Sequence, residues 1–258
     1  MNGKLLGGGP VMLDVIWQNR NVLAQIESQI ADERRKLDSW LADAYTAWPD
    51  ASFNGEHDAG YPNWGDVENL AAQVFDNRLT SKLSDGCVRS LLFFISRSDE
   101  CGRIVGWLYT TTGTPLSGIG DLTYDDFIFL CNRAVSQPDD FCDYQLVACF
   151  QKLETLNTED QALLKSFFHA KADSYTRRMV VHAFAKFTLA DTVSLIEQLW
   201  ATDDCEFAKI SCLYSLEPFP ECRSLFDRFL VEYQSSFPVA EADYRQVHMQ
   251  RFHAIQAK

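Results

Sequence analysis

The sequence lacks the residue spacings that mark most metal and catalytic sites. Its 258 residues include five histidines and eight cysteines, but no HExxH, HxH or CxxC motif and no Cys/His pairing at zinc-ligand spacing. Glu56, His57 and Asp58 offer three possible ligands, but consecutive residues on a glycine-flanked loop cannot form a closed tetrahedral site. Acids are plentiful, yet nothing singles out a pair for acid–base hydrolysis. We therefore predict no metal, no cofactor and no catalytic residue.

Positive charge is scarce. The chain has 23 lysines and arginines against 36 aspartates and glutamates, which gives a net charge of −13. Nucleic acids are held by clustered Lys and Arg side chains, so this balance argues against a nucleic-acid partner and equally against an anionic membrane surface. A basic protein would instead be attracted at long range.

Long apolar runs are also absent. No uninterrupted stretch approaches the roughly 18 residues needed to span a bilayer, and the N-terminal MNGKLLGGGPVML has neither the apolar core nor the cleavage site of a secretory signal. We expect a cytoplasmic protein. Gly7–Pro10 lacks the GxxxxGK[ST] spacing of a phosphate-binding loop, so residues 1–11 are predicted to form a flexible N-terminus.

Helical periodicity, by contrast, is present and repeated. Five apolar residues from Cys142 to Leu153 recur at i, i+4, i+7, i+8 and i+11, which places them on one face of an α-helix. Similar faces begin at Cys101, Thr176 and Cys205. In every copy, the residue two positions earlier has a side chain that can cap a helix. These predicted N-caps are Asp99, Asp140, Ser174 and Asp203.

Each copy follows another helical segment after a short break, which makes the two helices antiparallel neighbours. These first helices are predicted at 85–97, 123–136, 158–170 and 189–201. Thr123 with Asp126, and Asn157 with Asp160, predict N-terminal caps. A fifth pair is expected at 221–234 and 240–256.

The unit is thus a helical hairpin that repeats every 29 to 41 residues, and it resembles a degenerate HEAT-like repeat. The resemblance lies in the hairpin length, the aspartate at the turn within the hairpin and the apolar face of the second helix. A basic residue that HEAT units often carry early in the second helix is matched at Arg103 and Arg178, whereas Tyr144 and Phe207 stand at the other two positions. The resemblance implies an all-α fold, a right-handed superhelical stack of antiparallel helix pairs known as an α-solenoid.

Three segments follow from this assignment. They are the flexible N-terminus at 1–11, an N-terminal helical cap at 12–82 and the hairpin repeats at 83–258. Within the cap, the pattern predicts one long helix at 21–48, an acidic-aromatic loop at 48–66 and a helix with Asp66 as its N-cap.

The repeat also accounts for most of the cysteines. Cys101, Cys142 and Cys205 share one repeat position, and Cys149 and Cys212 share another. A small, weakly polar side chain is needed where helices pack closely, so we predict buried thiols rather than redox or metal chemistry.

The acidic-aromatic loop has two interpretations. Tyr and Trp are enriched at interface hot spots and acids complement basic partners, so the loop can be a protein-binding surface. Alternatively, its aromatic side chains fold back as a plug that covers the end of the stack, while its acids face outward. The residues concerned are Trp48, Asp50, Phe53, Glu56, Asp58, Tyr61, Trp64 and Asp66.

A short basic stripe lies on the predicted second helix of the third copy. Arg178, His182 and Lys186 are spaced at i, i+4 and i+8, opposite the core residues. Second helices line the concave face in HEAT-like stacks. Arg178 and His182 are therefore candidate contacts for an acidic group, and a solvated helix face is the alternative.

These features predict a protein that binds another protein and performs no chemistry. An acidic solenoid of this size resembles bacterial immunity proteins, so we expect it to neutralise a cognate, basic toxin by steric and electrostatic occlusion. The alternatives are an adaptor or regulatory scaffold that binds a peptide in its concave groove, and a HEAT-like DNA glycosylase or lyase. A continuous apolar groove along the second helices would favour the adaptor, and a deep pocket with convergent Asp and aromatic residues would favour the enzyme.

Overall fold

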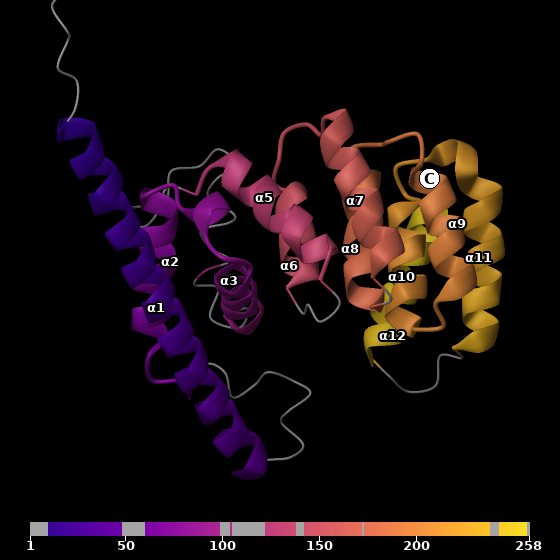
Figure 1. Cartoon of the computed structure of the whole chain (residues 1–258). Coiled ribbons are helices and arrows are strands. Elements are labelled where there is room, and N and C mark those ends of the chain that lie inside the picture. The colour runs from indigo at the N-terminus through magenta and orange to yellow at the C-terminus, as the bar shows by residue number, and fades with distance from the viewer. Residues whose placement is uncertain are drawn as a thin grey trace, which may run out of the picture. The chain divides into compact units, whose positions relative to one another are not determined.

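A computed structural model of the chain describes residues 10–47, 60–98, 104, 122–137, 142–171, 173–237 and 243–256. Eleven α-helices and no strand lie in these residues, which confirms the all-α prediction (Figure 1). The chain divides into two compact units, Met1–Cys142 and Asp143–Lys258, which are described separately. The predicted division of the chain into a cap and a repeat segment at residue 82 stays a prediction.

Unit 1 is organised around one long helix. Its helices are α1 (Pro10–Ala47), α2 (Trp64–Asp76), the short 3₁₀ helix η3 (Thr80–Lys82), α3 (Asp85–Arg97) and α5 (Tyr124–Val135). Both α2 and α3 pack against α1, and α5 packs against α3 and η3. A buried stripe of α1, made by Ile26, Ile30, Leu37 and Leu41, forms the seam of this core because these residues recur at helical spacing.

The start of α1 corrects one prediction. The long helix was expected from residue 21, after a flexible N-terminus at 1–11, but it begins at Pro10. Proline favours the first helical position because its fixed φ suits the helix and its missing N–H would have no partner there. Residues 1–9 lie outside the described residues.

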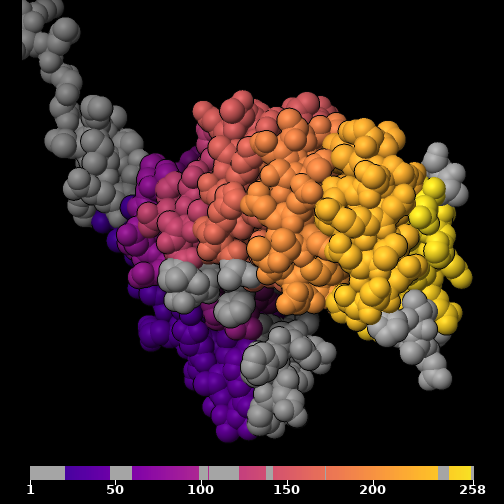
Figure 2. Space-filling model, turned by 90° about the vertical axis from the view of Figure 1, so that its right-hand side faces the viewer, coloured from indigo at the N-terminus to yellow at the C-terminus, as the bar shows by residue number. Residues whose placement is uncertain are grey.

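Unit 2 consists of seven α-helices joined by short connections. They are α6 (Asp143–Phe150), α7 (Thr158–Ala170), α8 (Ser174–Lys186), α9 (Thr192–Thr202), α10 (Glu206–Ser215), α11 (Arg223–Ser236) and α12 (Asp243–Gln256), with the 3₁₀ helix η5 (Pro220–Cys222) before α11. The most extensive contacts join α8 to α6 and to α10. The orange and yellow residues of unit 2 form one closely packed block (Figure 2).

Two predicted caps are confirmed. Thr123 with Asp126, and Asn157 with Asp160, form capping boxes in which side chain and backbone bond reciprocally.

Three other predicted caps are wrong by one to three residues. Asp173, rather than Ser174, accepts the N–H groups of the first turn of α8. Asp203 lies in the turn before α10, where it accepts the N–H of Cys205. Asp66 lies within the first turn of α2 and is exposed. The N-cap residue of α2 is Asn63, three positions earlier. The predicted caps Asp99 and Asp140 lie outside the described residues.

The repeated apolar face is buried in most positions. In the second and third copies, Leu146, Phe150, Val180 and Phe184 are fully buried. The first copy, from Cys101, falls outside the described residues except for Ile104, which is buried.

The cysteines follow the same pattern with one exception. Cys142, Cys149 and Cys212 are buried as predicted, and burial raises the pKa of the Cys212 thiol to about 12, which keeps it protonated. Cys205 is exposed, so the prediction of a buried thiol is wrong there.

Candidate protein-binding surface

Of the ten residues predicted from the sequence to bind a protein, the structure describes five. Trp48, Asp50, Phe53, Glu56 and Asp58 lie outside the described residues. Tyr61, Trp64 and Asp66 belong to unit 1, and Arg178 and His182 belong to unit 2.

Tyr61 and Trp64 are core residues of unit 1. Their exposed fractions are 4% and 2%, and the Tyr61 ring makes edge-to-face contacts with Trp64 at 5.8 Å and with Trp40 of α1 at 5.6 Å. These contacts hold the start of α2 against α1. The burial of Tyr61 and Trp64 favours the plug interpretation for these two side chains, and their role in binding stays a prediction.

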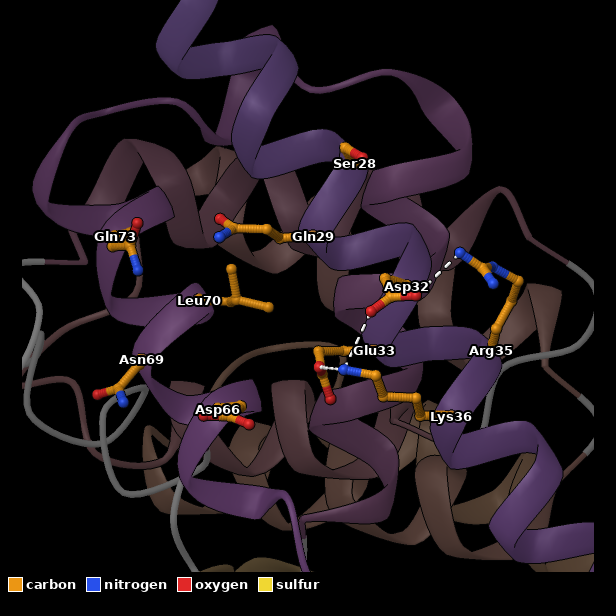
Figure 3. Close-up of a pocket in the computed structure, with 10 residues that line it drawn as sticks. All are labelled: Ser28, Gln29, Asp32, Glu33, Arg35, Lys36, Asp66, Asn69, Leu70 and Gln73. Carbon is orange, nitrogen blue, oxygen red and sulfur yellow. Dashed lines mark hydrogen bonds and ion pairs between the residues drawn. The ribbon is translucent and has the colours of Figure 1, made fainter.

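Asp66 lines a polar pocket between α1 and α2 of about 530 Å³. Figure 3 shows Gln29 of α1 and Leu70 of α2 pointing toward each other across it, with Asp66 on the α2 wall. The other lining residues are Ser28, Asp32, Glu33, Arg35, Lys36, Asn69 and Gln73. Only one of the ten lining residues, Leu70, is apolar. The pocket is therefore a polar recess and not an apolar ligand cavity.

The charges on the α1 wall of this pocket compensate each other. Lys36 Nζ lies 2.5 Å from Glu33 Oε1 and 3.0 Å from Asp32 Oδ2, and the guanidinium of Arg35 lies 2.9 Å from Asp32 Oδ1. Hydrogen bonds to Glu33 and Asp32 raise the pKa of Lys36 further. Glu33 is only 6% exposed and its second oxygen lies 3.4 Å from the Tyr61 hydroxyl. Asp32 and Glu33 are thus paired with cations of their own helix, and Asp66 on the α2 wall is exposed.

Arg178 and His182 lie on one face of α8, as predicted, but they are joined to α10 rather than solvated. Arg178 Nε donates to Ser211 Oγ at 2.9 Å, and His182 Nδ1 lies 3.1 Å from Ser215 Oγ. Burial, with a smaller contribution from the charge of Arg178, lowers the pKa of His182 to about 4, so this side chain is neutral at pH 7. The expectation of a basic stripe is corrected at His182, while the role of Arg178 in binding stays a prediction.

The third member of the stripe also joins helices. Lys186 Nζ donates to the backbone carbonyls of Gln151, at 2.5 Å, and Leu153, at 3.2 Å, just beyond the end of α6. These bonds join α8 to the turn that follows α6.

A surface that the sequence did not single out lies beside Arg178. The second residue of each of four helices is aromatic: Tyr144 of α6, Tyr175 of α8, Phe207 of α10 and Tyr244 of α12. We call these four residues, with Arg178, the aromatic row. Tyr175, Phe207 and Tyr244 are 46%, 49% and 43% exposed.

Successive members of the aromatic row are in contact. The rings of Tyr144 and Tyr175 meet edge to face at 4.6 Å, and those of Phe207 and Tyr244 stack at 6.3 Å. Between these pairs, the guanidinium of Arg178 lies 5.1 Å from the Tyr175 ring centre and 5.5 Å from that of Phe207, within the range of cation–π attraction. The row therefore continues across four helices.

The sequence carried a signal for this row. Tyr144 and Phe207 stand where the HEAT pattern has a basic residue. When residues are counted from the first residue of α6, α8, α10 and α12, the second position is aromatic in all four helices. The next residue is buried in three of the four helices, as Gln145, Thr176 and Ala208, so the aromatic residue stands beside the buried face of its helix.

No protein-family model, curated protein or solved structure matches the chain. In the part of the chain that the structure describes, no three His, Cys, Asp or Glu side chains are grouped so as to hold a metal ion. None of the described helices is long and apolar enough to cross a membrane.

Proposed function

We propose that the chain is a non-enzymatic protein-binding protein and that its partner contacts the aromatic row. The exposure of Tyr175, Phe207 and Tyr244 on three neighbouring helices is the observation that carries the proposal. Aromatic and arginine side chains dominate interface hot spots because they supply a large contact area with few rotatable bonds. Most large apolar side chains of the described residues are buried. Three exposed rings in one row are therefore typical of a surface that binds another molecule.

We also propose that unit 2 is built from HEAT-like hairpins. The contacts of α8 with α6 and α10 are those expected between second helices of successive repeats. The shared second position of the row residues supports the same register. The division between the compact units falls between α5 and α6, within the second predicted hairpin, so the proposal of a superhelical stack is made for unit 2.

An adaptor or regulatory scaffold that binds a peptide segment is the mode that this surface favours. Apolar rings along the second helices are the feature that distinguishes such a protein from one that blocks a toxin with charge alone.

Toxin neutralisation is the second candidate, and the charge distribution favours it. Residues 1–142 contain 20 acids and 11 lysines and arginines, a net charge of −9, while residues 143–258 carry −4. A basic toxin would be attracted mainly to unit 1, where Asp66 faces solvent. Co-expression with the toxic products of neighbouring genes tests this candidate: abolished toxicity supports it, and rescue of none of them removes it.

Affinity capture from the native cells tests the proposal itself. The bait proteins are the wild-type chain, the double variant Tyr175→Ser/Phe207→Ser and the control Val231→Ser, which alters a 62%-exposed apolar residue of α11 outside the row. We expect the double variant to lose a defined partner by at least about ten-fold, because hot-spot truncations cost 2 kcal/mol or more. Equal recovery on all three baits would refute a role for the aromatic row.

A further inference from the structure

Arg178 is held in one orientation by three contacts. Its Nε donates to Ser211 Oγ, which is 2% exposed, and its guanidinium lies between the rings of Tyr175 and Phe207. The adjacent His182–Ser215 bond repeats the link between α8 and α10 one turn further along. An arginine fixed in this way loses little conformational entropy when it binds a ligand.

The two terminal nitrogens of Arg178 are available. Neither has an acceptor among the described residues, and neither is a buried unpaired atom, so both reach solvent. No described carboxylate lies within 4.0 Å of Arg178. By contrast, Arg228, Arg245 and Arg251 of the same unit each lie within 4.0 Å of a glutamate.

Three acids near the row residues along the chain are already engaged. Asp173 accepts the N–H groups of Tyr175 and Thr176, and Asp203 accepts that of Cys205. Glu206 binds Arg245 at 2.7 Å and accepts the hydroxyls of Tyr233 and Tyr244, and the hydrogen bond from Arg245 lowers its pKa most. With His182 neutral, Arg178 is the charged member of the aromatic row, and it lacks a counter-charge among the described residues.

We propose that Arg178 binds a carboxylate of an acidic, apolar-containing segment of the partner, laid across α8 and α10. A guanidinium presents parallel N–H groups that match the two oxygens of a carboxylate, and the flanking Tyr175 and Phe207 rings receive the neighbouring apolar side chains. This inference rests on the proposed function and specifies the chemistry of the segment that the row receives. The partner as a whole can be basic, since the inference concerns one segment.

Three labelled peptides test the chemistry with the full chain, by fluorescence anisotropy. They are octapeptides that alternate leucine with aspartate, asparagine or lysine, each with an amidated C-terminus, and the asparagine peptide is also used with a free C-terminal carboxylate. We expect the aspartate peptide to bind at least about ten-fold more tightly than the amidated asparagine peptide, because bonds between charged groups are the stronger kind. The difference should shrink as salt is raised. Tighter binding of the free-acid asparagine peptide than of its amide would identify a terminal carboxylate as a ligand of the same chemistry.

Variants then locate the site. Arg178→Gln should weaken the aspartate peptide about ten-fold, and Arg178→Lys, which keeps the charge without the planar fork, should weaken it less. The matched control is Arg228→Gln, because Arg228 also lies over an aromatic ring, at 5.2 Å from Phe229, but has glutamates beside it. It should leave peptide binding unchanged.

Preference for the lysine or the amidated asparagine peptide, equal binding of all peptides or the absence of binding would each overturn the inference. So would equal effects of Arg178→Gln and Arg228→Gln. None of these outcomes touches the proposed function, which depends on partner capture by the row variant and not on the charge of the segment.

Discussion

Two groups of aromatic side chains in this chain differ in their exposure to solvent. In unit 1, Tyr61 and Trp64 are buried, and they fasten α2 to α1. In unit 2, Tyr175, Phe207 and Tyr244 remain nearly half exposed on neighbouring helices. The first group belongs to the acidic-aromatic loop that the sequence predicts as a candidate interface, yet the second group is the one exposed to solvent.

The difference comes from the backbone positions of these residues. Tyr61 and Trp64 lie where the chain enters α2, which packs directly on α1, so their rings fill the angle between two helices. The row residues stand one position before buried residues such as Thr176 and Ala208, about 100° around the helix from them, on a side that the neighbouring helices leave partly exposed. Residue type alone therefore does not distinguish an interface from a plug, whereas position relative to the core face does.

Truncation of one ring from each group should give the largest difference in the free energy of unfolding. We expect Trp64→Ala to destabilise unit 1 by about 3–5 kcal/mol, because it removes a fully buried ring, and Phe207→Ala to cost about 1 kcal/mol or less, because the ring is half exposed. Hydrogen exchange of the amides in α2 and α10 measures each unit separately. A cost for Phe207→Ala that matches that of Trp64→Ala would make the row part of the core.

Acid should weaken unit 2 through His182. Its pKa falls from an ordinary value of 6.5 to about 4 in the folded chain, so the unfolded state binds the proton more readily between these values. The contribution of the neutral histidine is complete above pH 6.5 and is lost as pH falls toward 4, with a loss of up to about 2 kcal/mol at pH 5.

Urea unfolding at pH 7 and pH 5 measures this loss. His182→Gln should reduce it, whereas the control His253→Gln, on an exposed residue of α12, should leave it unchanged. Unit 1 has no histidine among its described residues and should change less. An undiminished pH dependence in His182→Gln would show that other groups cause it.

The smallest effect should come from two helix ends, one in each unit. Arg78 after α2 and Thr188 after α8 both have positive φ, 53° and 48°, and in both turns the following N–H bonds a carbonyl five residues back. Thr188→Gly should stabilise the chain by about 1 kcal/mol, because a β-branched residue is strained there. Arg78→Gly should gain less, since it also removes the ion pair between Arg78 and Asp126. Thermal melts compare the two variants, and an equal gain would contradict the role given to that ion pair.

The sequence was informative where short-range order decides the structure. Apolar spacing predicted α3 and α7 to the residue, and the polar pairs predicted the caps of α5 and α7, because these signals act within one or two turns. It placed Arg178 and His182 on one helix face for the same reason. The sequence did not reveal the bonds of Arg178 and His182 to Ser211 and Ser215. Each bond joins residues 33 positions apart and depends on how α8 is aligned with α10.

The aromatic row was missed for a related reason. Whether Phe207 is exposed depends on which side of α10 its neighbours α8, α9, α11 and α12 cover, and no local pattern states this. Likewise, Trp64 in the sequence has the composition of an interface residue, and only the packing of α2 on α1 buries it.

Photo-crosslinking in the native cells tests the central claim most directly. p-Benzoylphenylalanine is placed at position 207 in the aromatic row, at position 231 on α11 and at position 73 in the polar pocket of unit 1, which compares the two units in one experiment. Binding through the row predicts one defined protein adduct from position 207 and little from positions 231 and 73. An adduct from position 73 alone, or equal yields from all three positions, would contradict it.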